Sequence, residues 1–209
     1  MLVAYATSVN IVLPKKATNR VEYAAEYLQK KLLQQGFAVS VTKNGKADKN
    51  SECKVYLSIS KNTASLKKEG FEITTTVKQS KKGAITNISI VGNDGTGCIY
   101  ACNELAEQIK KNGISKLPSS VKDAPEMVLR GGCIGVQKPY LLPGRMVYEY
   151  PYTPELFPWF YDKQHWIEYL DMLVENRMNS VYLWNGHPFA SLVKLPDYPY
   201  AVEVDDATF

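Results

Sequence analysis

Apolar residues recur at every second position in several short segments of the first half of the chain. This spacing is typical of half-buried β-strands, because successive side chains point to opposite faces of a sheet. We therefore predict strands around residues 9–13, 37–41 and 53–59. Two further alternating segments, 71–77 and 85–91, flank a lysine-rich turn and predict a β-hairpin.

Two segments have the helical period instead. The first begins at Asn19 and Glu22, which have the spacing of a capping box, and ends at Gly36. The second runs from about residue 98 to 111 and is followed by Gly113. Each has one apolar stripe, formed by Val21, Ala24, Leu28 and Leu32 in the first helix and by Cys98, Cys102, Leu105 and Ile109 in the second. The pattern predicts a small α/β (α+β) domain, a mixed sheet with two helices on it.

The pattern changes after Gly113. Residues 114–125 contain two prolines and three serines with no sustained period, so we predict a linker there. A buried strand at 127–134, an irregular loop, a helix from Asp162 to Arg177 and a short apolar strand at 181–184 then follow, and Asn179 is expected to be the left-handed residue between the last two. This order predicts a β-α-β unit of a parallel sheet.

Charge divides the chain near the same place. Residues 1–122 contain 19 Lys and Arg against 9 Asp and Glu, whereas residues 123–209 contain 6 against 12. Two such different surfaces favour two domains, which we place at 1–113 and 126–209 on either side of the linker. The basic half has 18 lysines but a single arginine, Arg20, and few aromatic residues between them, which favours a solvated surface over a nucleic-acid site.

Several other functional classes are not expected. No apolar run approaches about 18 residues, so we predict no membrane span. The apolar start at residues 1–6 lacks the features of an intact signal peptide, although it could be the remnant of one. The four cysteines, Cys53, Cys98, Cys102 and Cys133, have no CxxC spacing and no histidine at metal-ligand spacing, so we predict no metal site.

A glycine-rich segment, 92–97, stands between the fifth predicted strand and the second helix. Its spacing matches neither the dinucleotide-binding nor the P-loop fingerprint, so we interpret it as a tight turn with Thr96 near the helix cap and expect no nucleotide or other organic cofactor. Cys98 and Cys102, four residues apart on one helix face, are interpreted as core residues.

Three motifs carry a resemblance to a known family. Gly92-Asn-Asp-Gly-Thr-Gly-Cys-Ile-Tyr-Ala and the helix that follows resemble the small non-catalytic N-terminal domain of family 20 hexosaminidases and of α-glucuronidases. Leu129-Arg-Gly-Gly132 resembles the first strand of their TIM barrel, and Arg177-Met-Asn-Ser-Val-Tyr-Leu-Trp184 resembles the turn into the second strand. The resemblance covers nearly the whole chain and implies a glycoside hydrolase, with the first β-α-β unit of an incomplete barrel after the small domain.

Glycoside hydrolysis usually requires a pair of carboxyl groups. The resemblance places them on later barrel strands, and a whole barrel takes about 250 residues, whereas about 85 follow the predicted linker. We therefore assign no catalytic residue within the chain and expect the fragment alone to be inactive. Asp205 and Asp206 are adjacent carboxylates, but we interpret them as solvated or helix-capping. The alternative function is a stand-alone carbohydrate- or protein-binding module.

Four residues are candidates for substrate binding. Arg130 lies in a strand expected to be buried, where an unpaired guanidinium is costly; the resemblance implies a contact with sugar hydroxyls, and an ion pair with another barrel strand is the alternative. Trp184, Asn185 and His187 come at the carboxyl end of the second barrel strand, where barrel active sites are built. An indole stacks on a sugar ring, and amide and imidazole groups bind hydroxyls, but packing at the barrel rim explains these residues equally well.

An aromatic loop precedes the helix of the second domain. It either walls a carbohydrate cleft or packs against neighbouring protein, and it comprises Tyr148, Tyr150, Tyr152, Phe157, Trp159, Phe160 and Tyr161. His165, on the helix itself, is expected at the surface. The expected partner of the whole protein is an oligosaccharide or polysaccharide substrate, and the resemblance alone implies a periplasmic or secreted location. The sequence indicates no oligomeric state.

Overall fold

The computed structural model describes residues 7–60, 66–80, 83–135, 141–142, 145–146 and 158–184. The chain forms two compact units, Met1–Val128 and Leu129–Phe209.

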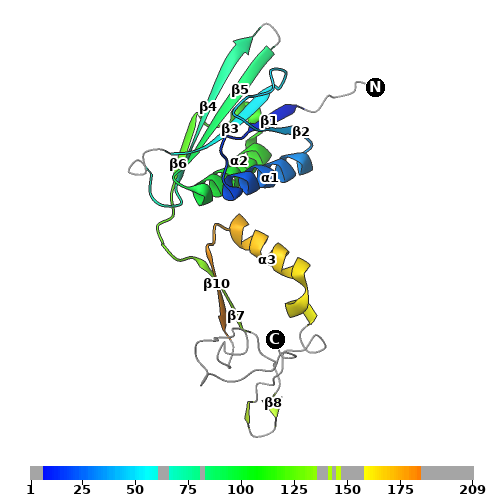
Figure 1. The fold of residues 1–209 in the computed structure, drawn as a ribbon, viewed down its shortest axis with the longest axis vertical. Coiled ribbons are helices and arrows are strands. Elements are labelled where there is room, and N and C mark those ends of the chain that lie inside the picture. Colours follow the sequence, from blue (N-terminus) through cyan, green and yellow to red (C-terminus); the bar gives the residue numbers. More distant parts are fainter. Residues whose placement is uncertain are drawn as a thin grey trace. The chain divides into compact units, whose positions relative to one another are not determined.

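The first unit is built on a six-stranded mixed sheet (Figure 1). Its strands are β1 (Ser8–Val12), β2 (Ala38–Thr42), β3 (Cys53–Ile59), β4 (Phe71–Ser80), β5 (Gly83–Gly92) and β6 (Ser120–Asp123), in the order β2-β1-β3-β5-β4-β6. Strands β2, β1, β3 and β5 are parallel, whereas β4 runs antiparallel to both β5 and β6. The predicted mixed sheet and the β4–β5 hairpin are both confirmed.

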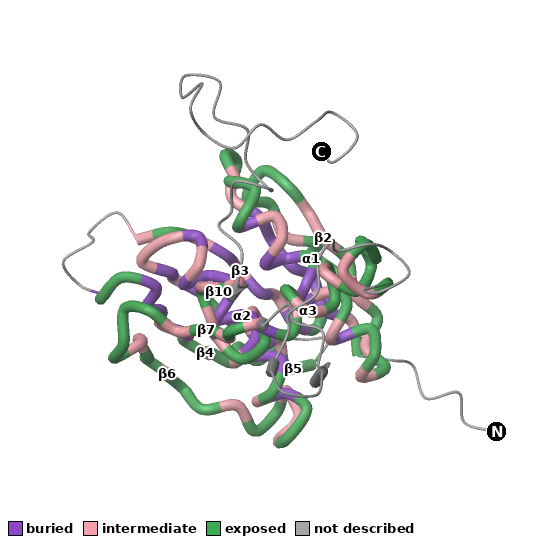
Figure 2. Tube along the Cα trace, turned by 90° about the horizontal axis from the view of Figure 1, so that it is seen from below, coloured by how far each residue is buried: buried purple, intermediate pink, exposed green. Residues whose placement is uncertain are grey.

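Two helices, α1 (Asn19–Gln34) and α2 (Gly95–Asn112), lie side by side against this sheet (Figure 1). The core forms between the two layers. All eight residues of the two predicted apolar stripes are buried, together with the helix-facing strand residues such as Val9, Val55 and Ile88. Figure 2 shows this buried interior within the first unit. The hydrophobic periods therefore assigned the core-facing positions correctly.

The helix ends differ in part from the prediction. The residue before α1 is Thr18, whose side chain makes no capping hydrogen bond, so the predicted capping box at Asn19 is wrong. Glu22 instead forms an exposed ion pair with Lys43, with 3.1 Å between the carboxylate oxygen and Nζ. Gly36, with φ of +86°, follows the end of α1 as predicted. Helix α2 begins at Gly95, three residues earlier than predicted.

The segment predicted to be a linker, 114–125, belongs to the fold of the first unit. It contains a short 3₁₀ helix, Ile114–Lys116, and then β6, which pairs with β4 through partners such as Ile73 and Val121. Strand β4 would otherwise have unpaired backbone groups along its outer edge, and β6 satisfies them. One apolar residue, Val121, was too weak a periodic signal to predict a strand. The compact unit consequently extends to Val128, well past the predicted domain end at residue 113.

This geometry predicts where a protease will cut first. Met127, Val128 and Leu129 are 67%, 82% and 75% exposed, whereas 120–123 is hydrogen-bonded in the sheet. Because proteases need an exposed segment that can unfold locally, limited digestion with chymotrypsin is expected to cleave after Met127 or Leu129, leaving 114–123 attached to the first unit. Mass spectrometry of the fragments would measure this. Early cleavage within 114–123 would instead support the original linker prediction.

The second unit contains a parallel β-α-β arrangement. Strands β7 (Gly131–Gly135) and β10 (Ser180–Trp184) pair in parallel, from Gly131 with Ser180 to Gly135 with Trp184. Helix α3 (Lys163–Glu175) lies between them in the chain and is preceded by a 3₁₀ turn, Pro158–Tyr161. Two-residue strands β8 (Leu141–Leu142) and β9 (Arg145–Met146) form a separate antiparallel pair. The predicted β-α-β unit is therefore confirmed.

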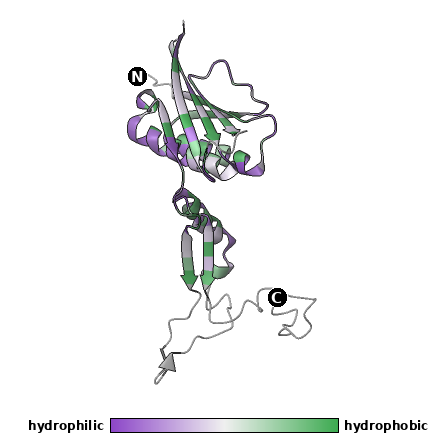
Figure 3. Cartoon of the chain, turned by 90° about the vertical axis from the view of Figure 1, so that its left-hand side faces the viewer, coloured by the Kyte–Doolittle hydropathy of each residue, from purple (hydrophilic) through white to green (hydrophobic). Residues whose placement is uncertain are grey.

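The two parallel strands are much more exposed than the sequence suggested. Figure 3 shows apolar residues along β7 and β10, yet Tyr182 on β10 is 59% exposed and Leu170 on α3 is 48% exposed. Leu173 alone is buried among the described residues of this unit. Parallel sheets are normally covered on both faces, whereas α3 covers one face of these two strands. The expectation of fully buried strands thus fails within these residues.

Candidate functional site

The glycine-rich segment forms a packed turn around Asp94. One carboxylate oxygen of Asp94 accepts a hydrogen bond from the Gly97 backbone N–H at 2.9 Å, and the other accepts one from the Glu69 N–H at 3.0 Å. The carboxylate therefore occupies the start of α2, the position at which a helix would bind a phosphate. Asp94 is thus the N-cap, and Thr96 instead accepts a hydrogen bond from an Arg20 guanidinium nitrogen at 3.0 Å.

The glycines of this turn allow close packing of backbone on backbone. A methyl group at Gly97 would overlap the carbonyl oxygen of Gly70, and one at Gly92 would lie 2.6 Å from the backbone nitrogen of Cys98. The space next to these glycines is thus filled by the protein itself. This supports the interpretation of 92–97 as a structural turn.

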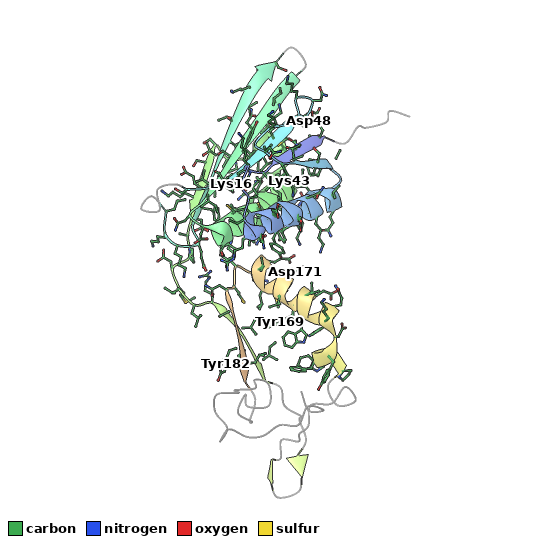
Figure 4. The ribbon with its side chains drawn as sticks, viewed as in Figure 1. Lys16, Lys43, Asp48, Tyr169, Asp171 and Tyr182 are labelled. Carbon is green, nitrogen blue, oxygen red and sulfur yellow. The ribbon has the colours of Figure 1, made fainter. Side chains whose placement is uncertain are left out.

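A second polar cluster, which the sequence analysis missed, surrounds Asn10. This side chain is fully buried, donates to the Ser40 hydroxyl at 2.9 Å, and accepts from the Thr42 hydroxyl at 3.3 Å and the Asp48 backbone N–H at 2.9 Å. It thereby ties the segment after β2, which carries Lys43 and Asp48 in Figure 4, to β1. In the sequence, this cluster was indicated by one polar residue, Asn10, within the otherwise apolar run 9–13. With its hydrogen bonds satisfied inside the protein, Asn10 has a structural role.

The thiols of the first unit are held in their protonated, unreactive form. Burial raises the pKa of Cys53 to about 12 and that of Cys98 to about 11, and it raises the pKa of Cys102 well above its ordinary value. Since the thiolate is the reactive form, these cysteines are unsuited to nucleophilic catalysis. Cys98 and Cys102 are core residues, as predicted. Among the described residues, no cluster of three or more His, Cys, Asp or Glu side chains has a metal-binding arrangement.

Arg130 lies just before β7, at the amino end of the strand. Its Nε donates a hydrogen bond to the Arg177 carbonyl oxygen at 2.8 Å, and its backbone N–H donates to the Asn179 side-chain oxygen at 3.0 Å. Its carbonyl oxygen accepts from the Ser180 hydroxyl at 2.9 Å. Arg130 therefore joins the start of β7 to the turn between α3 and β10. These contacts support a structural role, and the substrate contact stays a prediction.

The turn that Arg130 holds differs from the predicted one. Arg177, with φ of +55°, is the left-handed residue after α3, and Asn179, to which that conformation was assigned, is not among the residues with positive φ. The Met178 N–H returns to the Leu173 carbonyl at 2.8 Å and closes the helix end. Asparagine adopts the left-handed conformation more readily than arginine does. The hydrogen bonds that close the helix end nevertheless require this conformation at Arg177.

Gly131 and Gly132 provide room for close contacts within the second unit. A methyl group at Gly131 would overlap the Ser180 backbone, and one at Gly132 would lie 2.7 Å from the Tyr169 hydroxyl oxygen. Tyr169 comes from α3, so Gly132 lets this helix approach the strand (Figure 4). Because neither glycine has a side chain, β7 can lie close to both β10 and α3.

The described part of the aromatic loop packs on the first turn of α3. Trp166 donates its indole N–H to the Phe160 carbonyl at 2.7 Å, and the Trp159 ring lies 6.1 Å from that of Trp166 and 5.6 Å from that of His165. Asp162 caps the helix by accepting from the Gln164 N–H at 2.8 Å. For Trp159 and Phe160 these contacts favour packing over a cleft wall, whereas Tyr161 is 53% exposed. The other predicted members, Tyr148, Tyr150, Tyr152 and Phe157, lie outside the described residues, and His165 is exposed as predicted.

The remaining candidate residues are at or beyond the carboxyl end of β10. Trp184 is its last residue and pairs with Gly135, the last residue of β7. Asn185 and His187, like Asp205 and Asp206, lie outside the described residues. The five residues of β7 separate Arg130 from this end by about 15 Å along the strand. The structure thus does not bring Arg130 together with Trp184.

Comparison with known proteins defines the class of the chain. Residues 3–124 match the family model of glycosyl hydrolase family 20, domain 2. The protein therefore contains an α/β domain of the glycoside hydrolase type, as the resemblance predicted. More particularly, the chain belongs to the family of glycosyl hydrolase family 20 domain 2. No match was found among the curated proteins.

Two solved structures illustrate the similarity. The GH138 enzyme targeting pectin rhamnogalacturonan II is 50% identical in sequence, with a TM-score of 0.73 over 96% of this chain and 21% of that enzyme. The chitobiase from Flavobacterium johnsoniae, a family 20 enzyme, is 16% identical, with a TM-score of 0.48 over 84% of this chain and 23% of that one. The chain thus spans about a fifth of the length of each relative.

No helix among the described residues has the length and apolar character needed to cross a membrane.

Proposed function

We propose that this chain is the N-terminal part of a glycoside hydrolase that acts on a pectic oligosaccharide or polysaccharide, with the catalytic carboxyl groups outside these 209 residues. The observation that carries the proposal is the 50% identity with the GH138 enzyme, which extends over 96% of the chain and includes the second unit. Identity of this extent favours a pectic substrate over the hexosaminidase- or glucuronidase-like substrate that the sequence motifs suggested.

In this proposal the second unit is the start of a (β/α)₈ barrel. Strands β7 and β10 are parallel and joined through α3, which is the repeating unit of such a barrel. Val181 pairs with Gly132, which lies beside Tyr169 of α3, so the exposed Tyr182 belongs to the strand face that points away from α3. That face would line the barrel interior, and further strands would cover it.

Substrate contacts are proposed for Trp184, Asn185 and His187. Trp184 ends β10 and the other two residues come after it in the chain, and barrel enzymes build their active sites from the loops at that end of their strands. For Arg130, at the opposite end of β7, we favour the structural contact with the Arg177 carbonyl, and its predicted substrate contact is tested separately below. The first unit has a non-catalytic role in the proposal, because its described polar clusters around Asp94 and Asn10 are used for packing and capping.

An activity assay would test this proposal. The full-length enzyme encoded by the same gene is expected to release sugar from rhamnogalacturonan II oligosaccharides and to leave aryl N-acetylglucosaminides and aryl glucuronides intact. The 209-residue chain is expected to show no turnover above a buffer blank on any of them, since a positioned acid and nucleophile are both needed. Activity of the full-length enzyme on the aryl N-acetylglucosaminide alone would contradict the pectic substrate.

Turnover by the isolated chain would contradict the assignment of the catalytic groups to other parts of the protein. Asp205→Asn and Asp206→Asn variants would then show whether these carboxylates were responsible. The proposal also includes a periplasmic or secreted location, which cell fractionation and immunoblotting of the native protein would test.

A further inference from the structure

The face of the sheet opposite α1 and α2 is a continuous polar surface on the three strands β3, β4 and β5. Residues on β3 alternate, with Cys53, Val55 and Leu57 buried in the core and Lys54 and Tyr56 on the other face. The strand register sets their neighbours in two rows, Lys54 with Asn87 and Thr76, and Tyr56 with Ser89 and Thr74. We call these six residues the outer face.

The outer face is accessible to a ligand. Thr74, Thr76 and Ser89 are exposed, while Lys54, Tyr56 and Asn87 are half-buried. Neighbouring strands are about 4.8 Å apart, so the three strands present a strip about 10 Å wide. A strip of this width accommodates an extended chain of sugar rings lying on the sheet.

The side chains suit a saccharide that carries carboxylates. A tyrosine ring presents an apolar surface to the C–H face of a sugar and a hydroxyl to its polar groups, and amide and hydroxyl side chains both donate and accept hydrogen bonds. Lys54 adds a cation beside Tyr56, and Lys78 adds a second cation two residues beyond Thr76 on the same strand face. Glu72 is the one carboxylate on the same face of β4.

The charge of the whole region agrees with an acidic partner. Residues 1–122 have an excess of ten positive charges, 19 Lys and Arg against 9 Asp and Glu. Pectic polysaccharides contain uronic acids and are therefore polyanions. We propose that the outer face is a non-catalytic docking surface for an acidic oligosaccharide, with Tyr56 as the stacking residue and Lys54 as a carboxylate ligand. The choice of an acidic saccharide rests on the proposed pectic function.

Titration of the 209-residue chain with oligogalacturonate of six residues tests the proposal. Saturable binding is expected, with chemical-shift changes in ¹H–¹⁵N NMR spectra concentrated on β3, β4 and β5. Binding should weaken as salt is raised, because exposed charges are screened. Tyr56→Ala and Lys54→Gln are each expected to raise Kd tenfold or more. Lys30→Gln, an exposed lysine on α1, is the matched control and should leave Kd unchanged.

Three results would overturn the proposal. Absence of saturable binding removes the docking surface, and an equal loss of affinity in Lys30→Gln shows diffuse charge attraction in its place. Equal binding of a neutral cello-oligosaccharide rejects the acidic class of ligand. The Lys54→Gln variant keeps the test valid if Tyr56→Ala fails to fold. The result is independent of the hydrolysis assay: a full-length enzyme active on rhamnogalacturonan II, with no binding by this chain, would refute the docking surface alone.

Discussion

Replacement of Gly97 by alanine is expected to destabilise the first unit by about 3 kcal/mol, the upper part of the range for overpacking a core. The added methyl group would overlap the Gly70 carbonyl oxygen and lie 3.3 Å from the Gly92 Cα atom. Both neighbours are backbone atoms, so no side-chain rotation can relieve the overlap. Relief would require α2 to move away from the sheet, which would also disturb the Asp94 cap. Urea denaturation of the 209-residue chain, followed by circular dichroism, would measure the loss.

Gly36→Ala is the matched control for this change. Gly36 follows the end of α1 with φ of +86°, and a methyl group there would meet nothing within 4 Å. The N–H groups of Gly36 and Phe37 bond to the carbonyls of Leu33 and Leu32, the pattern of a helix end closed by a left-handed residue. The expected loss is therefore the cost of a left-handed conformation alone, about 1 to 2 kcal/mol. If Gly97→Ala lost no more stability than Gly36→Ala, the close packing of α2 against Gly70 would not be a major constraint on the fold.

The second large effect is expected for Arg130→Lys in the full-length enzyme, where the melting temperature should fall while kcat/KM of the folded enzyme stays near that of the wild type. Lysine keeps the positive charge but lacks the planar guanidinium that donates from Nε to the Arg177 carbonyl. Loss of this half-buried, charge-assisted hydrogen bond is expected to cost about 1 to 2 kcal/mol. The measurement pairs differential scanning calorimetry with steady-state kinetics on rhamnogalacturonan II oligosaccharides.

Lys163→Arg is the opposite exchange at an exposed position of α3. It controls for the effect of changing one cation to another and should alter neither the melting temperature nor kcat/KM.

A substrate-binding role of Arg130 predicts a different result. A guanidinium that binds sugar hydroxyls would make Arg130→Lys lower kcat/KM by roughly tenfold or more, equivalent to about 1.4 kcal/mol, at an unchanged melting temperature. That result would support a substrate contact for Arg130 in place of the structural role.

The elements predicted correctly share a strong local signal. The stripe of α1, from Val21 to Leu32, and the alternation in β3 each bury one side of a regular element, and such a period is visible in a single segment. Strand β6 lacked this signal, because a four-residue edge strand with one apolar position is stabilised by the backbone of β4. The capping role of Asp94 was missed for a related reason, since the neighbouring Thr96 is also a chemically suitable cap.

The candidate site was predictable only in part. Its sequence motifs indicated a glycoside hydrolase, and the family match confirms that class. The position of Arg130 at the amino end of β7 could not be predicted from the motif, because the start of this strand is set by its pairing with β10. The roles of Trp184, Asn185 and His187 stay predictions.

Local periodicity in the amino-acid sequence was thus sufficient for the type of each major element, the core-facing residues of the first unit and the order of strand, helix and strand in the second. Tertiary contacts alone decided that 120–123 joins the sheet, that Asn10 holds the segment after β2, and that Arg130 binds the turn at Arg177. The physical reason is the range of the interactions. A periodic apolar stripe is a property of one segment, whereas these hydrogen bonds join residues 38 to 52 positions apart, and a partner so distant becomes available only once the elements have packed.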